Sequence, residues 1–185
     1  MTVTETPSLT GTYAIDPTHS RIGFVARHAM VTKVRGSFNE FEGSGRFDQE
    51  HPESSTIELT IQAASVDTRN ADRDGHVRGA DFFDVETYPT LAFAATSVEA
   101  LSEDTFRVTG DLTIKATTKP VTIDFELSGP AVDPWGNTRI GLEGSTVVNR
   151  KEWGLSWNAA LEAGGVLVSD KVTLEFEVSA VRAGD

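Results

Sequence analysis

The stretch from Thr105 to Leu127 constrains the fold most, because apolar and polar residues alternate in it on both sides of a turn. One face holds Phe106, Val108, Leu112 and Ile114 in the first run and Val121, Ile123, Phe125 and Leu127 in the second. A period of two is typical of β-strands. We therefore expect a long antiparallel hairpin with its turn at residues 117–120 and with one face in water.

One hairpin is unstable alone in water, so its apolar face must pack against further strands. The same alternation recurs in several short runs, at residues 12–15, 20–28, 57–63, 88–95, 140–148 and 172–178. Glycines interleaved with phenylalanines between residues 36 and 47 indicate bends that let a sheet curl. Roughly eight or nine strands with almost no helical period favour an all-β fold, a closed antiparallel eight-stranded barrel; a two-sheet sandwich is the alternative.

Two segments lack the strand period. Residues 68–80, followed by Asp81-Phe82-Phe83-Asp84, predict a short helix or ordered loop that plugs one end of the barrel. The spacing of oxygen-bearing residues in 70–75 imitates a calcium loop, but a strand precedes it and Asn opens it, so we expect no metal. The second irregular segment is 149–165. The sequence predicts one domain, residues 11–182, after a flexible arm of residues 1–10.

Composition excludes several classes of protein. The net charge of -12 and the pI near 4.7 disfavour nucleic acid and anionic lipid surfaces as partners. The absence of cysteine removes disulfides, thiolate nucleophiles and cysteine-ligated metals. No apolar run approaches the length of a membrane span and the first residues lack the pattern of a secretion signal, so we expect a cytoplasmic protein without stable membrane insertion.

Small residues alternate with large ones on the inward faces of the predicted strands. Ala26, Ala63, Ala95 and Gly144 lie on the same faces as several phenylalanines. An eight-stranded barrel is either filled by its own side chains or has room for one slender ligand. An elongated ligand space and a plain packed core are both consistent with this pattern.

Six short motifs, in this order and spacing, resemble those of the YceI-like polyisoprenoid-binding proteins. They are Asp16-Pro17-Thr18-His19-Ser20, Val34-Arg35-Gly36-Ser37-Phe38, Asp81-Phe82-Phe83-Asp84, Tyr88-Pro89-Thr90, Val108-Thr109-Gly110-Asp111-Leu112-Thr113-Ile114 and Asn149-Arg150. The resemblance implies a lipocalin-like barrel that holds a long isoprenoid chain, such as a polyprenyl quinone or polyprenyl phosphate, and a homodimer. Many members of the family carry a secretion signal, and Ala116 replaces a glycine that they usually have. No catalytic residue comes with the resemblance.

The candidate ligand-binding residues are inward positions of the predicted strands and prominent side chains of 149–165. They are Phe24, Ala26, His28, Ile57, Leu59, Ile61, Phe93, Leu112, Ile114, Ile123, Phe125, Leu142, Arg150, Trp153, Trp157 and Phe176. His28 is either a head-group ligand at the barrel mouth or a paired histidine of the wall. The tryptophans, beside Arg150, either cover a ligand or close the core. His19 next to Asp16 predicts a turn held by side-chain hydrogen bonds.

These observations predict a non-enzymatic protein that carries or stores an isoprenoid lipid, with no cofactor. No serine-histidine-aspartate elbow, phosphate loop, zinc helix or dinucleotide fingerprint is present in the sequence. Two alternatives stay open: a barrel enzyme that acts on an apolar substrate, and a filled barrel with a structural or interaction role.

Overall fold

The computed structural model describes residues 8–159, 161 and 167–183. The regular elements are β1 (Gly11–Ile15), η1 (Pro17–His19), β2 (Arg21–His28), β3 (Thr32–Phe38), β4 (Phe41–Phe47), η2 (Pro52–Ser54), β5 (Thr56–Gln62), η3 (Ala63–Ser65), β6 (Val66–Asp67), α1 (Ala71–Arg78), β7 (Thr90–Ala100), β8 (Thr105–Ile114), β9 (Thr117–Val132), β10 (Thr138–Asn149), η4 (Arg150–Trp153) and β11 (Lys171–Arg182).

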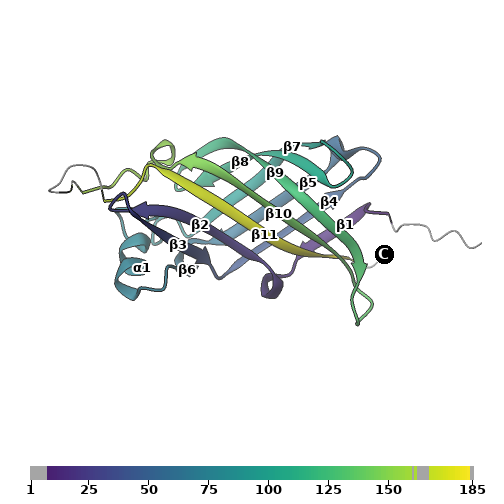
Figure 1. Cartoon of the computed structure of the whole chain (residues 1–185), viewed down its shortest axis with the longest axis horizontal. Helices are drawn as coiled ribbons and strands as arrows, with labels where there is room; N and C mark the ends of the chain where they lie inside the picture. Colours follow the sequence, from purple (N-terminus) through teal and green to yellow (C-terminus); the bar gives the residue numbers. More distant parts are fainter. Residues whose placement is uncertain (1–7, 160, 162–166, 184–185) are drawn as a thin grey trace, which may run out of the picture.

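The strands form one antiparallel sheet that closes into an elongated barrel (Figure 1). Eight strands make the closed circuit, in the order β1-β4-β5-β7-β8-β9-β10-β11, and β11 returns to β1. The register of that last pairing joins Tyr13 to Arg182 and Ile15 to Ala180. The prediction of a closed eight-stranded antiparallel barrel is therefore confirmed.

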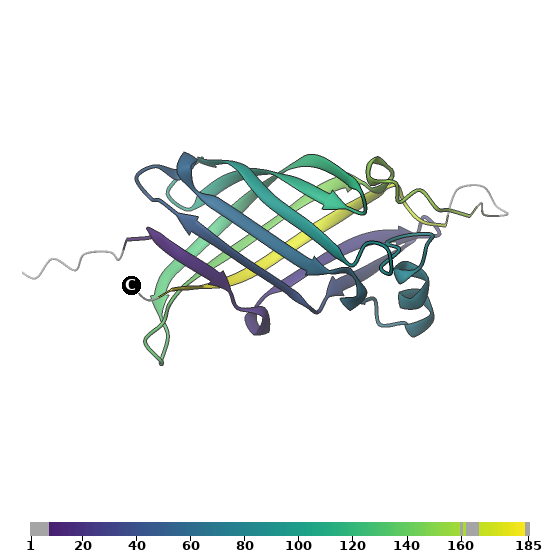
Figure 2. The same cartoon turned by 180° about the vertical axis from the view of Figure 1, so that it is seen from behind.

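Three further strands extend the sheet on one side of β11. Its first half pairs with β2, from Thr173 opposite Val25 to Glu177 opposite Arg21, whereas its end pairs with β1. β3 pairs with β2 over its full length, but β6 reaches β3 only at Ser37 and Phe38. In both views the β2–β3 hairpin projects at the α1 end of the molecule, opposite the end where β1 begins (Figures 1 and 2). The sheet has eleven strands, more than the eight or nine that the sequence pattern indicated. β2 was predicted, but the stretch rich in glycine and phenylalanine forms two strands, β3 and β4, and β6 has only two residues.

The hairpin of β8 and β9 is present, but its turn is two residues earlier than predicted. Ile114 pairs with Thr117, so Lys115 and Ala116 form the turn and Lys115 takes a left-handed φ of 57°. Pro120 lies inside β9, opposite Asp111. Its missing N–H is tolerated there because β10 pairs with β9 only from Asp124 onward, which leaves this part of β9 with a neighbour on one side.

The predicted non-strand excursion at 68–83 contains α1. Asn70 caps this helix, since its Oδ1 accepts a hydrogen bond from the Arg73 amide at 3.0 Å. The buried Asp74 accepts hydrogen bonds from the backbone and the hydroxyl of Thr68. Two of the oxygens that imitate a calcium loop therefore have structural roles: that of Asn70 caps α1, and that of Asp74 anchors α1 to Thr68, the residue after β6.

Glycines in the wall permit phenylalanine rings to lie directly over the neighbouring strand. Gly36 is opposite Phe24 and Gly144 is opposite Phe125, and a Cβ at residue 144 would lie 2.8 Å from that second ring. This packing of large against small residues is one of the two arrangements with which the alternation is consistent. The predicted arm lies mostly outside the described residues, but Leu9 is buried and its carbonyl accepts a hydrogen bond from the Tyr13 hydroxyl at 2.8 Å.

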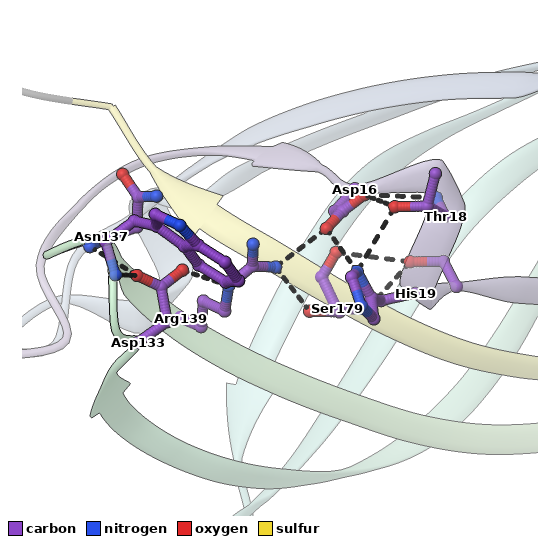
Figure 3. Close-up of polar contacts among 9 residues, drawn as sticks. Asp16, Thr18, His19, Asp133, Asn137, Arg139 and Ser179 are labelled. Atoms are coloured by element: carbon purple, nitrogen blue, oxygen red, sulfur yellow. Dashed lines mark hydrogen bonds and ion pairs between the residues drawn. The ribbon is translucent and has the colours of Figure 1, made fainter.

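An ion-paired network outside the barrel joins the turn after β1 to the β9–β10 hairpin (Figure 3). Asp16 accepts hydrogen bonds from the Thr18 hydroxyl at 2.6 Å and pairs with His19 Nδ1 at 2.7 Å, so the predicted turn is confirmed. Arg139 contacts Asp16 Oδ2 at 2.8 Å and Asp133 Oδ2 at 2.7 Å. Arg139 therefore links residues more than one hundred positions apart.

Candidate functional site

The barrel has a cavity of about 480 Å³ at its α1 end. β2 and β3 supply one side of its wall, α1 and the following loop close it, and the segment after β10 lies across the rest. Its apolar lining consists of Phe24, Ala26, Val34, Phe38, Val77, Phe82, Phe83, Leu91, Ile114, Val148, Trp153, Leu155, Trp157, Leu167, Val168, Val172 and Leu174. The volume is within the range of ~300–1,000 Å³ that is usual for small-molecule pockets.

Strand alternation explains how β2 and β3 form this wall. Phe24 and Ala26 lie on one face of β2 and pair with Gly36 and Val34 of β3, and all but the glycine line the cavity. The ring of Phe24 lies 5.7 Å from that of Phe38. Of the inward positions predicted on this strand, Phe24 and Ala26 lie in the wall of the cavity.

Polar side chains gather at the mouth of the cavity. Arg27, His28, Asp72, Arg73 and His76 are among its lining residues. Arg73 is held by the Thr68 hydroxyl at 2.8 Å, and His76 Nε2 lies 2.9 Å from Asp81 Oδ2. His28 is exposed and no side-chain hydrogen bond to another described residue fixes it. The structure thus places His28 at the mouth and not in a paired position inside the wall.

The two tryptophans of the irregular segment have different roles. Trp153 is 2% exposed, and its Nε1 donates a hydrogen bond to the Leu112 carbonyl at 2.9 Å. Trp157 is only half-buried; its ring centroid is 4.5 Å from that of His76 and 5.5 Å from that of Phe82. Trp153 therefore closes the core as well as lining the cavity, whereas Trp157 belongs to an aromatic cluster at the mouth.

Arg150 is 5% exposed and its donors are occupied by backbone carbonyls. The guanidinium donates to Ser169 at 2.8 Å, to Trp157 at 2.9 Å, to Val168 at 3.3 Å and also to Leu155. Burial lowers the pKa of this guanidinium below its ordinary value. Arg150 thus fixes the loops that cover the cavity, and it has little donor capacity left for a ligand head group.

A smaller cavity of about 120 Å³ lies at the opposite end of the barrel. Its apolar lining is Tyr13, Ile15, Phe47, Ile57, Leu59, Phe93, Val98, Phe106, Val108, Phe125, Leu127, Ile140, Leu142, Val178 and Ala180. Four predicted ligand residues line neither cavity: Ile61, Leu112, Ile123 and Phe176. Along their strands they lie between or beside the residues that line the two spaces, and Ile61, Leu112 and Ile123 are buried in the main core. We call these four residues the partition.

The predicted ligand residues consequently fall into three groups. Those at the larger cavity are Phe24, Ala26, His28, Ile114, Arg150, Trp153 and Trp157, and those at the smaller one are Ile57, Leu59, Phe93, Phe125 and Leu142. The rest form the partition. A single elongated interior was expected, but core side chains divide it into two spaces.

Sequence reasoning missed several residues of the larger cavity. Val172 and Leu174 belong to a run that was predicted as a strand, so their alternation was a usable signal. Val77, Phe82 and Phe83 were not assigned to the site, although their segment was expected to plug one end of the barrel. That plug is confirmed, because these three side chains line the cavity.

The chemistry of the larger cavity is that of apolar binding. Its interior is aliphatic and aromatic, and its polar groups are confined to the mouth or occupied within the fold. Within the described ranges no group of three or more histidine or acidic side chains is placed to hold a metal ion. No helix in those ranges has the length and hydropathy needed to cross a bilayer.

The fold and the site define a class: closed β-barrels with an internal apolar cavity at one end. A model of the YceI-like domain family matches residues 13–180. The UPF0312 protein of Ectopseudomonas mendocina is 40% identical over 146 residues, which cover 78% of this chain and 76% of that protein. The chain therefore belongs to the YceI-like family.

Solved structures agree with this assignment. The YCEI protein of Campylobacter jejuni is similar with a TM-score of 0.74 and 28% identity, over 85% of this chain and 90% of that one. A polyisoprenoid binding domain from Saccharophagus degradans, implicated in plant cell wall breakdown, gives a TM-score of 0.70 over 92% of this chain and 98% of the other. Its identity of 18% makes it evidence for the fold alone.

Proposed function

We propose that this protein binds a long isoprenoid lipid in the cavity at the α1 end and carries or stores it without catalysis. The observation that carries the proposal is the cavity of about 480 Å³ with its apolar interior and polar mouth. Such a space accepts a hydrocarbon chain inside and a polar head group near solvent. Membership of the YceI-like family is consistent with isoprenoids as the ligand class, and the Saccharophagus degradans domain, which shares this fold, is described as polyisoprenoid binding.

Burial of the hydrocarbon chain should contribute more to the binding free energy than contacts with the head group. Burial contributes about 0.8 kcal/mol per CH₂, so a prenyl chain of ~20 carbons supplies roughly 16 kcal/mol before ordering costs. One neutral hydrogen bond to a head group nets about 1 kcal/mol. Since Arg150 is already occupied by carbonyls, selectivity should follow chain length and width more than head-group identity.

The test is a pair of titrations with fluorescent prenyl probes. The first series keeps one head group and lengthens the chain, and the second keeps one chain with phosphate, hydroxyl or quinone heads. We expect affinity to rise with length until the cavity is filled and to change little with the head. An affinity that ignores length but depends steeply on the head would contradict the proposal.

A cavity-filling variant gives the matched control. Ala26→Phe adds a ring inside the larger cavity and should weaken probe binding, whereas Ala94→Phe adds the same ring on the exposed face of β7 and should not. Equal affinities for the two variants would place the ligand elsewhere. A completely filled barrel, the structural alternative, is disfavoured by the volume of the cavity.

A cytoplasmic location and a homodimer remain predictions. For the homodimer, light scattering of the purified protein, with and without bound lipid, measures the oligomeric state. An enzymatic role stays the second class of function, and a change in the mass of a lipid probe during incubation would reveal it.

A further inference from the structure

We propose that the tip of the β2–β3 hairpin docks on the surface of an anionic lipid bilayer, next to the mouth of the larger cavity. We call residues 27–35 the docking hairpin. This inference goes beyond the proposed function: docking requires no particular ligand in the cavity, and only the transfer of a lipid between bilayer and cavity rests on that function.

The tip of the docking hairpin is apolar, and its two larger side chains are exposed to solvent. Met30 is 60% exposed and Val31 is 77% exposed. Ala29 and Met30 take left-handed φ values of 52° and 66°, which favour glycine or asparagine. Stability of the turn alone therefore does not explain these residues, whereas side chains that enter a membrane interface have this character.

The charge of this region is opposite to that of the chain as a whole. Residues 17–39 contain Arg21, Arg27, Lys33 and Arg35 but no aspartate or glutamate, in a chain of net charge -12. Glu175 of the neighbouring β11 lies 3.4 Å from Arg21 and 3.9 Å from Arg35, so it neutralises part of this charge. The positive charge that remains is nearest the tip.

Arg27 and Lys33 are the cations next to the tip. They are directly opposite each other in the β2–β3 register, both exposed, and neither forms an ion pair with any described residue. Like charges at such positions destabilise a strand pair. An anionic surface would relieve that repulsion and match the charge, as basic residues do beside anionic lipid head groups.

The acidic remainder of the molecule opposes this docking only weakly. Asp72 of α1 lines the same cavity mouth and offsets part of the positive charge there. Charges more than about 8 Å from the contact are largely screened at physiological ionic strength. The end of the barrel with β1 and the β9–β10 hairpin points away from a surface that the docking hairpin touches (Figures 1 and 2). The docking hairpin is therefore the part of this end whose charge matches an anionic surface.

Docking would place the cavity beside the bilayer. The pair of β2 and β3 forms both features. Phe24, Ala26 and Val34 line the cavity, Lys33 and Arg35 alternate with Val34 and so lie on the opposite face of β3, and Arg27 is at the cavity mouth. His28 at the mouth is directly before the apolar tip. A lipid leaving the bilayer at this point has a short path through water.

Co-sedimentation with empty lipid vesicles tests the docking itself. We expect the protein to bind vesicles of mixed phosphatidylglycerol and phosphatidylcholine at low salt, and to release them at high salt or when phosphatidylcholine is the sole lipid. Met30→Ser/Val31→Ser should weaken this binding about tenfold. Lys33→Gln should weaken it about fivefold, as expected for one cation near an anionic leaflet.

Matched variants at the opposite end control for general loss of apolar surface or charge. Val132 and Trp135 are 66% and 80% exposed, and Val132→Ser/Trp135→Ser should leave vesicle binding unchanged. Arg46→Gln is the control for charge, since Arg46 is exposed on β4. Absence of binding to anionic vesicles, or equal loss in the control variants, would overturn the proposal.

Two further outcomes separate docking from other roles. Cations on an edge strand also prevent unwanted strand pairing between molecules. If the Lys33→Gln variant self-associates but keeps its full affinity for vesicles, Lys33 has that protective role and the docking proposal is contradicted. Titration with a prenyl probe in vesicle-free solution measures the cavity independently. Met30→Ser/Val31→Ser should keep the affinity for that probe, and a loss of probe affinity equal to the loss of vesicle binding would show that the variant damages the cavity instead.

Discussion

Arg139 neutralises two acidic turns at once on the outside of the barrel. Its hydrogen bonds to Asp133 and Asp16 keep the pKa of both carboxyl groups below the ordinary value of 3.8, and the Thr18 hydroxyl is the largest cause for Asp16. For Asp133 the pKa falls to about 2. The ionised form of both carboxyl groups is therefore more stable in the folded protein than in the unfolded chain.

The pH dependence of unfolding tests this network. Because the pKa values are lowered in the folded state, the stabilisation is present above pH ~4 and is lost as the pH falls toward about 2. Arg139→Gln should lower the free energy of unfolding at neutral pH and flatten its fall over this acid window, as measured by urea denaturation at several pH values. A variant with an acid profile parallel to that of the wild type would contradict the assignment.

Trp153 is a second residue whose effect can be isolated. Trp153→Phe keeps an aromatic ring but removes the donor to the buried Leu112 carbonyl, so we expect a loss of about 1–3 kcal/mol in the free energy of unfolding. Trp135→Phe is the control, because that side chain is 80% exposed and should change stability by less than about 0.5 kcal/mol. Equal effects would mean that the indole hydrogen bond contributes nothing.

At the scale of elements, the β8–β9 hairpin shows what alternation can and cannot predict. The inward faces of both strands were correct, because they follow directly from the period of two. The position of the turn was wrong, since Pro120 suggested a turn residue and the one-sided neighbourhood of β9 at this point is a tertiary property. The pairing of neighbouring strands, and not the turn propensity of residues 117–120, therefore sets the position of the turn.

Lys115 allows the corrected turn to be tested. A lysine in the left-handed region costs about 1–2 kcal/mol relative to an allowed conformation. Lys115→Gly should therefore raise the free energy of unfolding by about 0.5–1 kcal/mol after the entropy of glycine is subtracted. Ala116→Gly has no such strain to relieve and should lower stability. If the predicted turn at 117–120 were right, Lys115 would lie in extended backbone, and Lys115→Gly would lower stability just as Ala116→Gly does.

At the scale of the whole molecule, the partition is the feature that limits the ligand. Sequence patterns identified Leu112 and Ile123 as inward, which is correct, but inward residues of a barrel either line a space or fill it. That choice depends on how side chains from strands distant in sequence meet, and no alternation encodes it. The mouth was predicted only in part: the plug and His28 were among the expectations, but Arg73 and His76 of α1 reach the mouth through tertiary contacts that no alternation encodes.

Leu112→Ala tests whether the partition sets the chain length. Removing this buried side chain should cost about 2–5 kcal/mol of stability and open a passage toward the smaller cavity. We expect the length at which prenyl affinity stops rising to increase in this variant. Leu59→Ala, which enlarges the smaller cavity and leaves the partition in place, should not extend that limit. An unchanged limit in both variants would assign length selection to another feature.

β11 pairs with β2 along its first half and with β1 at its end, so the β2–β3 hairpin can separate from the sheet while the barrel stays closed. β1 closes the eight-stranded circuit through its pairs with β11, so that circuit persists when β2 and β3 move away from the first half of the same strand. Among the strands that the structure describes, β3 pairs only with β2 along residues 32–36. Opening of the larger cavity to solvent and unfolding of the barrel therefore have separate free energies. In amide hydrogen exchange, the amides of residues 32–36 should exchange well before those of β8 and β9.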